Sequence, residues 1–186
     1  MADALTPLRV TRLDADGLHR HREVLVDVYA EVYADRVSDP FFSPSRYWER
    51  LVVYGMRDGF TLVAGHVGED LVGYAMGFPL PEWTGWWKGL NEAVDPALLA
   101  EDGTRTFAIT EIMVRRPWQR QGHARALHDA LLSGRPEQRG ALLVLPSNGP
   151  AQAAYRSWGW ARLAGLRPFE DGPVYDAMVL NALPRR

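Results

Sequence analysis

Two side chains and one loop in this sequence could take part in chemistry. Glu111 lies among mostly apolar neighbours in the β-prone run 106–114. An unpaired carboxylate there would be costly, so it should meet water, a cation or an amine of a ligand, or else form a structural ion pair. Tyr155 lies in the helical stretch 150–158, and a phenol can donate a proton to a leaving group. These residues predict proton-transfer chemistry.

The loop 115–125 follows the run that ends at Val114 and opens a helix over 122–132. A helix start offers unpaired backbone N–H groups and a positive dipole end, and a glycine such as Gly122 lets the backbone approach a phosphate closely. We therefore expect a pyrophosphate here. The loop is also basic, enough for a few phosphates rather than a duplex, although the charges could simply form a solvated face. The basic residues are Arg115, Arg116, Arg120 and Arg125.

The same loop resembles the cofactor motif Gln/Arg-x-x-Gly-x-Gly/Ala of the GNAT superfamily of N-acetyltransferases, with Gln119, Gly122 and Ala124 in register. Further along, 148–160 is similar to the family's Asn, Ala, Tyr, Gly-Phe segment, with Trp160 in place of Phe. The final strand near 174–180 also looks like the family's. The resemblance covers roughly 60–182, and the earlier part agrees only in the order of its elements.

The resemblance implies the fold and the ligand. The fold class is α/β (α+β), with the GNAT architecture of a central mixed, mostly antiparallel sheet of six to seven strands flanked by about four helices. Residues 1–186 would form a single GNAT acetyltransferase domain. The co-substrate would be acetyl-CoA, with no metal.

The resemblance also implies roles for individual residues. Tyr155 would protonate the CoA thiolate, although its helical stripe equally suits a core aromatic. Asn148 would contact the cofactor arm. Backbone groups of one strand would bind the acetyl carbonyl and the pantetheine arm, and amides of the loop would hold the pyrophosphate. The strand residues are Ile112, Met113 and Val114, and the loop residues are Gln119, Arg120, Gln121, Gly122, His123, Ala124 and Arg125.

The general base and the acceptor pocket are less constrained. Glu111 is one candidate base, with Glu31, Asp35 or a water relay as alternatives. We expect the acceptor between 31–47 and 79–88, where acidic and aromatic side chains favour a cationic or aromatic amine. Those aromatics could instead only cover the sheet. The expected substrate-binding residues are Glu31, Asp35, Phe41, Trp83 and Trp86.

These observations predict an N-acetyltransferase. It would move an acetyl group from acetyl-CoA to a primary amine of a small molecule by direct attack through a tetrahedral intermediate. Two alternatives stay open: acetylation of a protein or peptide amine, and a non-catalytic module that binds acyl-CoA.

Composition excludes several other classes. The 186 residues carry a net charge of -2 and contain no cysteine, which argues against nucleic-acid binding through the whole surface and against thiolate or Cys-zinc chemistry. The histidines have no metal-ligand spacing. Neither a signal peptide nor a long apolar run is evident, so we expect a cytoplasmic protein without a membrane partner. The oligomeric state is left open, and a homodimer is compatible with the sequence.

Periodicity predicts the elements that position these groups. One helix should carry the apolar face from Leu18 to Val32, and a second should begin at Pro44 after a Ser43 cap. A hairpin should turn at 68–70, and 79–105 should be irregular around a short helix. A β-α-β unit should follow, then a helix and two strands. The β-α-β unit is expected over 106–114, 122–132 and 141–145. The later helix is expected over 150–158, and the two strands over 160–167 and 174–180.

Overall fold

The computed structural model describes residues 7–184, and this part of the chain gathers into two compact units. Unit 1 contains the described residues up to 77 together with 111–132, and unit 2 contains 78–110 together with 133–184. The strands form one mixed sheet in the order β1-β2-β3-β4-β5-β7-β6. Strands β3 (Asp70–Pro79) and β4 (Thr106–Val114) each have residues in both units.

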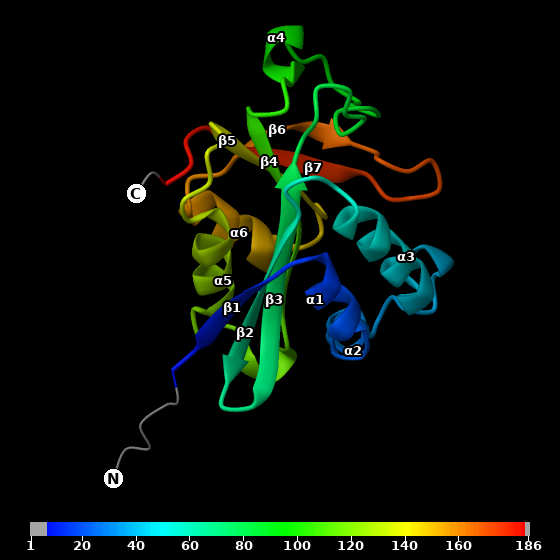
Figure 1. Cartoon of the computed structure of the whole chain (residues 1–186). Helices are drawn as coiled ribbons and strands as arrows, with labels where there is room; N and C mark the ends of the chain where they lie inside the picture. Colours follow the sequence, from blue (N-terminus) through cyan, green and yellow to red (C-terminus); the bar gives the residue numbers. More distant parts are fainter. Residues whose placement is uncertain (1–6, 185–186) are drawn as a thin grey trace. The chain divides into compact units, whose positions relative to one another are not determined.

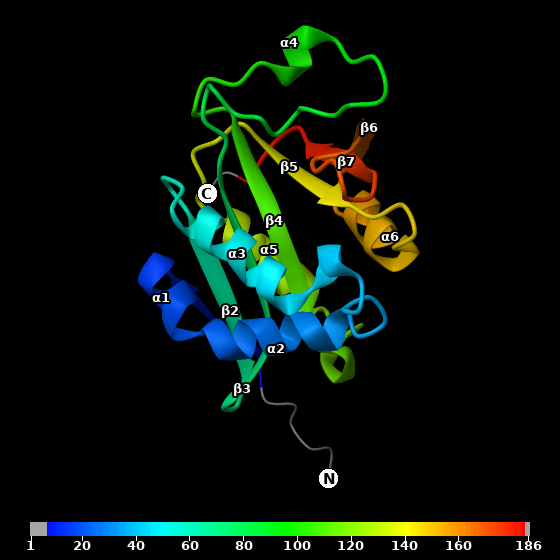
Figure 2. The same cartoon turned by 90° about the vertical axis from the view of Figure 1, so that its right-hand side faces the viewer.

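Unit 1 combines antiparallel strands with α-helices. Strand β1 (Arg9–Leu13) pairs with β2 (Thr61–Val67), and β2 pairs with β3. Figure 1 shows α1, α2 and α3 on one face of these strands and α5 on the other, and Figure 2 shows α2 and α3 next to each other. The helices are α1 (Ala15–Arg20), α2 (Arg22–Val32), α3 (Pro44–Gly55) and α5 (His123–Leu132), with short 3-10 helices η1 (Pro40–Phe42) and η2 (Arg116–Trp118).

Local side chains explain where the first helices begin and end. Ser43 caps α3 by accepting from the Arg46 N–H at 3.4 Å, and Pro44 is the first helical residue, as expected. The single helix expected from Leu18 to Val32 is instead two helices. The backbone turns at His21, whose N–H and ring Nδ1 both bond the Gly17 carbonyl, Nδ1 at 2.8 Å. Such a side-chain bond to the backbone competes with continued helix geometry.

The core of unit 1 lies between its strands and helices α1 to α3. It includes three large aromatic side chains with almost no exposed surface, Tyr29, Tyr47 and Tyr74, among aliphatic residues such as Leu25. Strands β3 and β4 approach closely at Gly73, where an added Cβ would lie 2.4 Å from the carbonyl oxygen of Met113. Only glycine fits there, so the close approach of the two strands depends on it.

Unit 2 contains the remaining strands. Strand β5 (Arg139–Val144) runs parallel to the first residues of β4, whereas β7 (Tyr175–Leu180) is antiparallel to both β5 and β6 (Ala161–Leu166). Helix α6 (Gly149–Ser157) connects β5 to β6, and the short α4 (Pro96–Leu99) lies in the connection between β3 and β4.

A buried ion pair holds that connection in unit 2. The Glu101 side chain, 1% exposed, accepts from the Arg139 guanidinium at 2.8 Å, the Trp87 indole at 3.0 Å and the Thr106 hydroxyl at 2.9 Å. Buried charges are tolerated when they are paired and hydrogen-bonded in this way. The irregular segment is therefore fixed to its own unit despite having little regular structure.

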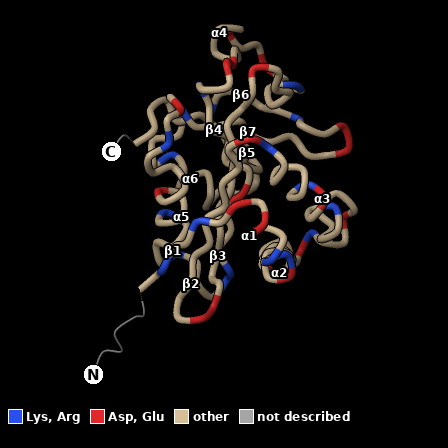
Figure 3. Tube along the Cα trace, viewed as in Figure 1, with Lys and Arg blue, Asp and Glu red and all other residues tan. Residues whose placement is uncertain are grey.

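The predicted architecture is confirmed, with more helices than expected. The sheet is mixed and seven-stranded, the hairpin turns at Gly68 with φ +60°, and β4 and β5 are parallel. Residues 7–184 contain six α-helices rather than about four, because 15–32 forms two helices; the short helix expected within 79–105 is Pro96–Leu99. The expectation of a single domain stays a prediction. Positive and negative residues are both scattered over the two units (Figure 3), which agrees with the small net charge.

Candidate functional site

Glu111 lies half-buried on β4 in unit 1, and its carboxyl group has an unusual pKa. Burial raises the pKa of Glu111 to about 7, although the positive charge of Arg50 lowers it. The negative charge of Glu111 in turn helps to raise the pKa of several tyrosines of the same unit. We call these residues, Tyr29, Tyr47, Tyr54 and Tyr74, the tyrosine cluster. A carboxyl group with this pKa can gain and lose a proton near neutral pH.

Hydrogen bonds order the tyrosine cluster. The hydroxyls of Tyr47 and Tyr74 lie 2.6 Å apart, and Tyr74 also lies 3.1 Å from the Leu25 carbonyl and 3.2 Å from the Met113 sulfur. A tyrosine has a single hydroxyl proton, so Tyr47 donates to Tyr74 when Tyr74 donates to the carbonyl. Met113 lies two residues after Glu111, on the same face of β4. The hydrogen-bonded tyrosines thus pack on the face of β4 that carries Glu111.

Arg50 is a functional candidate that the sequence reasoning missed. Its Nη1 donates to the Phe41 carbonyl at 3.3 Å, and its guanidinium carbon lies 5.4 Å from the centroid of the Phe41 ring and 5.7 Å from that of Tyr47. A signal was present, because Tyr47, Arg50 and Tyr54 follow i, i+3, i+7 spacing and so share one face of α3.

The predicted phosphate-binding loop has a backbone suited to an anion. Arg120 and Gly122 adopt left-handed conformations, with φ of 59° and 84°. Successive N–H groups in such turns form concave anion sites, and here they lead directly into α5. Apart from Gly122 and its neighbours along the chain, no atom of the described residues lies within 4 Å of the position a Gly122 Cβ would take. The Gln119 side chain donates to the Val114 carbonyl at 2.9 Å and closes the loop onto β4.

Glu31, an expected acceptor residue and alternative base, is instead bound to the start of this loop. Its Oε2 accepts from Arg115 Nη1 at 2.6 Å, and its Oε1 accepts from the Arg116 N–H at 2.8 Å. Asp35 lies 4.0 Å from the Arg116 guanidinium and is largely exposed. These contacts give Glu31 a structural role that the sequence alone did not indicate. The choice among Glu111, Glu31 and Asp35 as the base stays a prediction.

Asn148 and Tyr155 lie on unit 2. The Asn148 Oδ1 caps α6 by accepting from the Ala151 N–H at 3.2 Å, which leaves its amide N–H groups as donors for a ligand. The half-buried Tyr155 ring lies edge-on to Trp158, with centroids 5.5 Å apart, and 6.2 Å from Trp160. The ring therefore has the packing role of a core aromatic. The roles assigned to Asn148 and to the Tyr155 hydroxyl stay predictions.

The other expected acceptor residues differ widely in exposure. Phe41 is buried in unit 1, whereas in unit 2 Trp83 is 74% exposed and Trp86 is half-buried. Trp86 lies edge-on to the buried Trp87, with centroids 6.5 Å apart. An exposed tryptophan contributes little to the core, so Trp83 suits ligand contact better than packing. The acceptor pocket formed from these residues stays a prediction.

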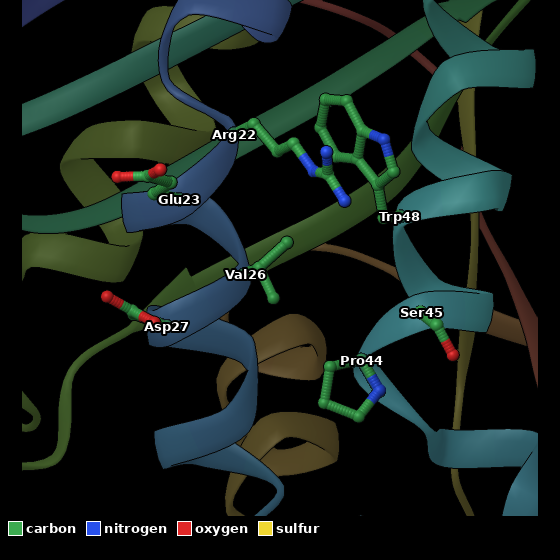
Figure 4. Close-up of a pocket in the computed structure, with 7 residues that line it drawn as sticks. All are labelled: Arg22, Glu23, Val26, Asp27, Pro44, Ser45 and Trp48. Carbon is green, nitrogen blue, oxygen red and sulfur yellow. The ribbon is translucent and has the colours of Figure 1, made fainter.

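A separate open pocket of about 630 Å³ lies between α2 and α3 of unit 1 (Figure 4). The Arg22 guanidinium lies over the Trp48 ring, 5.2 Å from its centroid, and two exposed carboxylates line the α2 side. Neither Glu111 nor the phosphate-binding loop lines this pocket, so it is not the predicted site. Its lining residues are Arg22, Glu23, Val26, Asp27, Pro44, Ser45 and Trp48.

Among residues 7–184, no group of three or more His, Asp or Glu side chains is arranged to hold a metal ion. Within the same range, no helix has the length and apolar character needed to cross a membrane.

Solved structures with the same fold cover nearly all of the chain. An acetyltransferase of the GNAT family from Bacillus cereus matches with a TM-score of 0.59 and 16% identity, covering 96% of this chain and 99% of its own. The ribosomal-protein-S18-alanine N-acetyltransferase from Escherichia coli matches with a TM-score of 0.59 and 17% identity, covering 96% of each chain. The PaiA N-acetyltransferase from Thermoplasma acidophilum, in complex with coenzyme A, matches with a TM-score of 0.57 and 9% identity, covering 94% and 99%.

Sequence comparison gives the family. No curated protein sequence matches the chain at a significant level. The sequence model of the acetyltransferase (GNAT) family, however, matches residues 25–160, which is well over half of the chain and includes the phosphate-binding loop and the Asn148 to Tyr155 segment. The chain therefore belongs to the acetyltransferase (GNAT) family.

Proposed function

We propose that this acyltransferase moves an acetyl group from acetyl-CoA to a primary amine of a small molecule, with Glu111 as the general base. The observation that carries the proposal is the half-buried Glu111 carboxyl group, whose pKa is raised by burial to about 7. A base whose pKa lies near the working pH is present in its active form and still accepts a proton readily.

The chemistry needs such a base. An alkylammonium group with a pKa of ~10.4 is only about 0.04% neutral at pH 7. Reaching the neutral amine therefore costs roughly 4.6 kcal/mol, which a base beside the amine reduces by accepting the proton. The amine nitrogen then attacks the thioester carbon, the carbon–sulfur bond breaks, and the thiolate leaves. No covalent intermediate with the enzyme is needed.

The other residues would bind acetyl-CoA, orient it and protonate its leaving thiolate. The left-handed turn at Arg120 and Gly122, with α5 behind it, supports pyrophosphate binding by the amides of 119–125. Backbone groups of 112–114 would bind the acetyl carbonyl and the pantetheine arm. Asn148 would donate an amide N–H to that arm, and Tyr155 would donate its hydroxyl proton to the leaving thiolate.

The experiment is a thiol-release assay with acetyl-CoA and a broad panel of amines. We expect at least one amine to be acetylated, with kcat/KM rising with pH along a limb near pH 7. Glu111→Gln should lower kcat by about 10²–10⁴ and remove that limb. Glu23→Gln is the matched control because Glu23 is exposed. This variant should leave kcat and the pH dependence unchanged.

Three outcomes would contradict the proposal. Release with peptides but not with small amines would favour a protein acetyltransferase. Tight acetyl-CoA binding without turnover on any amine would favour a binding module. A Glu111→Gln variant that keeps the wild-type pH profile would remove Glu111 as the base.

The cytoplasmic location, a possible homodimer, and the lack of nucleic-acid or membrane partners are retained as predictions.

A further inference from the structure

The charges around the tyrosine cluster differ from those expected for a purely cationic acceptor. Of the acidic residues within 31–47, the segment expected to attract a cation, Glu31 is bound to Arg115 and to the Arg116 N–H. Asp39 accepts from the Phe41 N–H at 2.9 Å and caps η1. The charge that acts on both Glu111 and the tyrosine cluster is instead the cation Arg50.

Arg50 is held in a defined orientation. Its guanidinium lies over the rings of Phe41 and Tyr47, both buried, and Nη1 donates to the Phe41 carbonyl. A side-chain contact with Arg50 and the charge of Arg50 both act to lower the pKa of the Tyr29 hydroxyl, against the larger effect of burial. A guanidinium has five N–H donors in a planar fork, so these two contacts leave donors for a ligand.

The contacts of unit 1 bring Arg50 and Glu111 to one side of β4. Arg50 lies over the Tyr47 ring, and the Tyr47 hydroxyl bonds that of Tyr74, which in turn contacts Met113. Met113 and Glu111 share one face of β4. A cation and a carboxylate therefore lie near the same aromatic rings, and the Arg50 charge acts to lower the pKa of Glu111.

We propose that the acceptor is an amine that also carries a carboxylate, with its carboxylate bound by the fork of Arg50 and its amine directed to Glu111. This inference rests on the proposed function and names the substrate class of that site. A planar guanidinium matches a carboxylate with two parallel hydrogen bonds, and its aromatic surroundings keep it from rotating away. A zwitterionic amine would place a charge of the opposite sign beside each of the two protein charges.

Arg50 could alternatively act only as the counter-ion of Glu111. The two roles differ in what they predict. A counter-ion changes the protonation of Glu111 for every acceptor alike, whereas a carboxylate-binding residue changes the preference between acceptors with and without a carboxylate.

The test compares acceptors in matched sets with acetyl-CoA in the thiol-release assay. Each set contains an amino acid, its amide and the corresponding decarboxylated amine, for example phenylalanine, phenylalaninamide and phenethylamine, together with ω-amino acids of increasing length. We expect the carboxylate-bearing member of at least one set to have a kcat/KM at least tenfold above its partners. The amide is the more stringent comparison, because its amine is more easily deprotonated.

Variants then assign the preference to Arg50. Arg50→Gln should reduce the acid-to-amide ratio to about one, and Arg50→Lys, which keeps the charge without the fork, should give an intermediate ratio. Arg46→Gln is the matched control: Arg46 is on the same helix and 4.7 Å from the same Phe41 ring, and this variant should keep the wild-type ratio. Melting temperatures of all three variants show whether the fold is retained.

The inference and the proposed function fail in different ways. Acetylation of neutral amines or amides with no preference for the carboxylate would overturn the inference and leave the acetyltransferase proposal in place. The same holds if a preference exists but Arg50→Lys and Arg50→Gln both retain it. If no amine of any set gives release of CoA, both the inference and the proposed function are overturned.

Discussion

Glu31 on α2 holds both the side chain of Arg115, at 2.6 Å, and the backbone N–H of Arg116, at 2.8 Å. Arg115 also donates from Nε to the Leu71 carbonyl at 2.9 Å. One carboxylate thus fixes the position at which the chain leaves β4 and enters the phosphate-binding loop. Since both side chains are less than one-third exposed, this ion pair is shielded better than a surface pair.

Changing Glu31→Gln should therefore weaken acetyl-CoA binding. The loss of the charged bonds, on the order of 1 kcal/mol, predicts a KM for acetyl-CoA raised about 3–10-fold with little change in kcat. Asp35→Asn is the control, because Asp35 is 4.0 Å from Arg116 and exposed. If a Glu31→Gln variant has normal acetyl-CoA kinetics and a raised KM for the acceptor, Glu31 binds the acceptor and does not support cofactor binding.

Substitutions at Gly122 test whether the phosphate-binding loop holds acetyl-CoA. Gly122→Glu should abolish measurable acetyl-CoA binding by calorimetry, because it strains a residue with φ +84° and places a negative charge where phosphates bind. Gly122→Ala carries the strain alone, about 1–2 kcal/mol, and should weaken binding less. Gly103→Glu is a matched control, since Gly103 has φ +85° and equally open space. If the Gly122→Glu and Gly103→Glu variants bind alike, the loop does not hold the cofactor.

Tyr155→Phe should keep the fold and the affinity for acetyl-CoA, because the ring contacts with Trp158 and Trp160 remain. Without the hydroxyl proton, kcat should fall by about 10²–10⁴. Tyr175→Phe, on β7 of the same unit, serves as the comparison. If chemistry is rate-limiting and kcat is unchanged, Tyr155 is only a core aromatic.

The stability of the protein should report the pKa of Glu111. The pKa of this carboxyl group rises from about 4.3 in the unfolded chain to about 7 in the fold. The resulting contribution to the free energy of unfolding is fully present below pH 4 and is lost as the pH rises through 7. Glu111→Gln cannot ionise, so its stability relative to the wild type should increase by up to about 3 kcal/mol between pH 4 and pH 8. Denaturant unfolding of both proteins measures this difference. A constant difference would mean that Glu111 has an ordinary pKa.

Local patterns in the sequence were sufficient for most of the secondary structure and for the family. The Ser43–Pro44 helix start, the turn at Gly68 and the strand 106–114 depend on neighbouring residues, so they could be predicted without knowledge of distant contacts. The left-handed loop at Gly122 was predictable for the same reason. The break at His21 was not, because the spacing of apolar residues gives no sign of the bond from the His21 ring to the Gly17 carbonyl.

Only the tertiary structure decided which charges are engaged and which remain for a ligand. In the sequence Glu111 is a candidate base with Glu31 as a rival. In the structure Glu31 meets Arg115, 84 residues away, whereas burial raises the pKa of Glu111 and the charge of Arg50 lowers it. A carboxylate's pKa and role depend on burial and on partners within a few ångströms, and the folding of the chain brings those partners from distant positions. The sequence by itself therefore determined the family and the cofactor motif, while the partners of Glu31, the burial of Glu111 and the place of Arg50 depend on long-range packing.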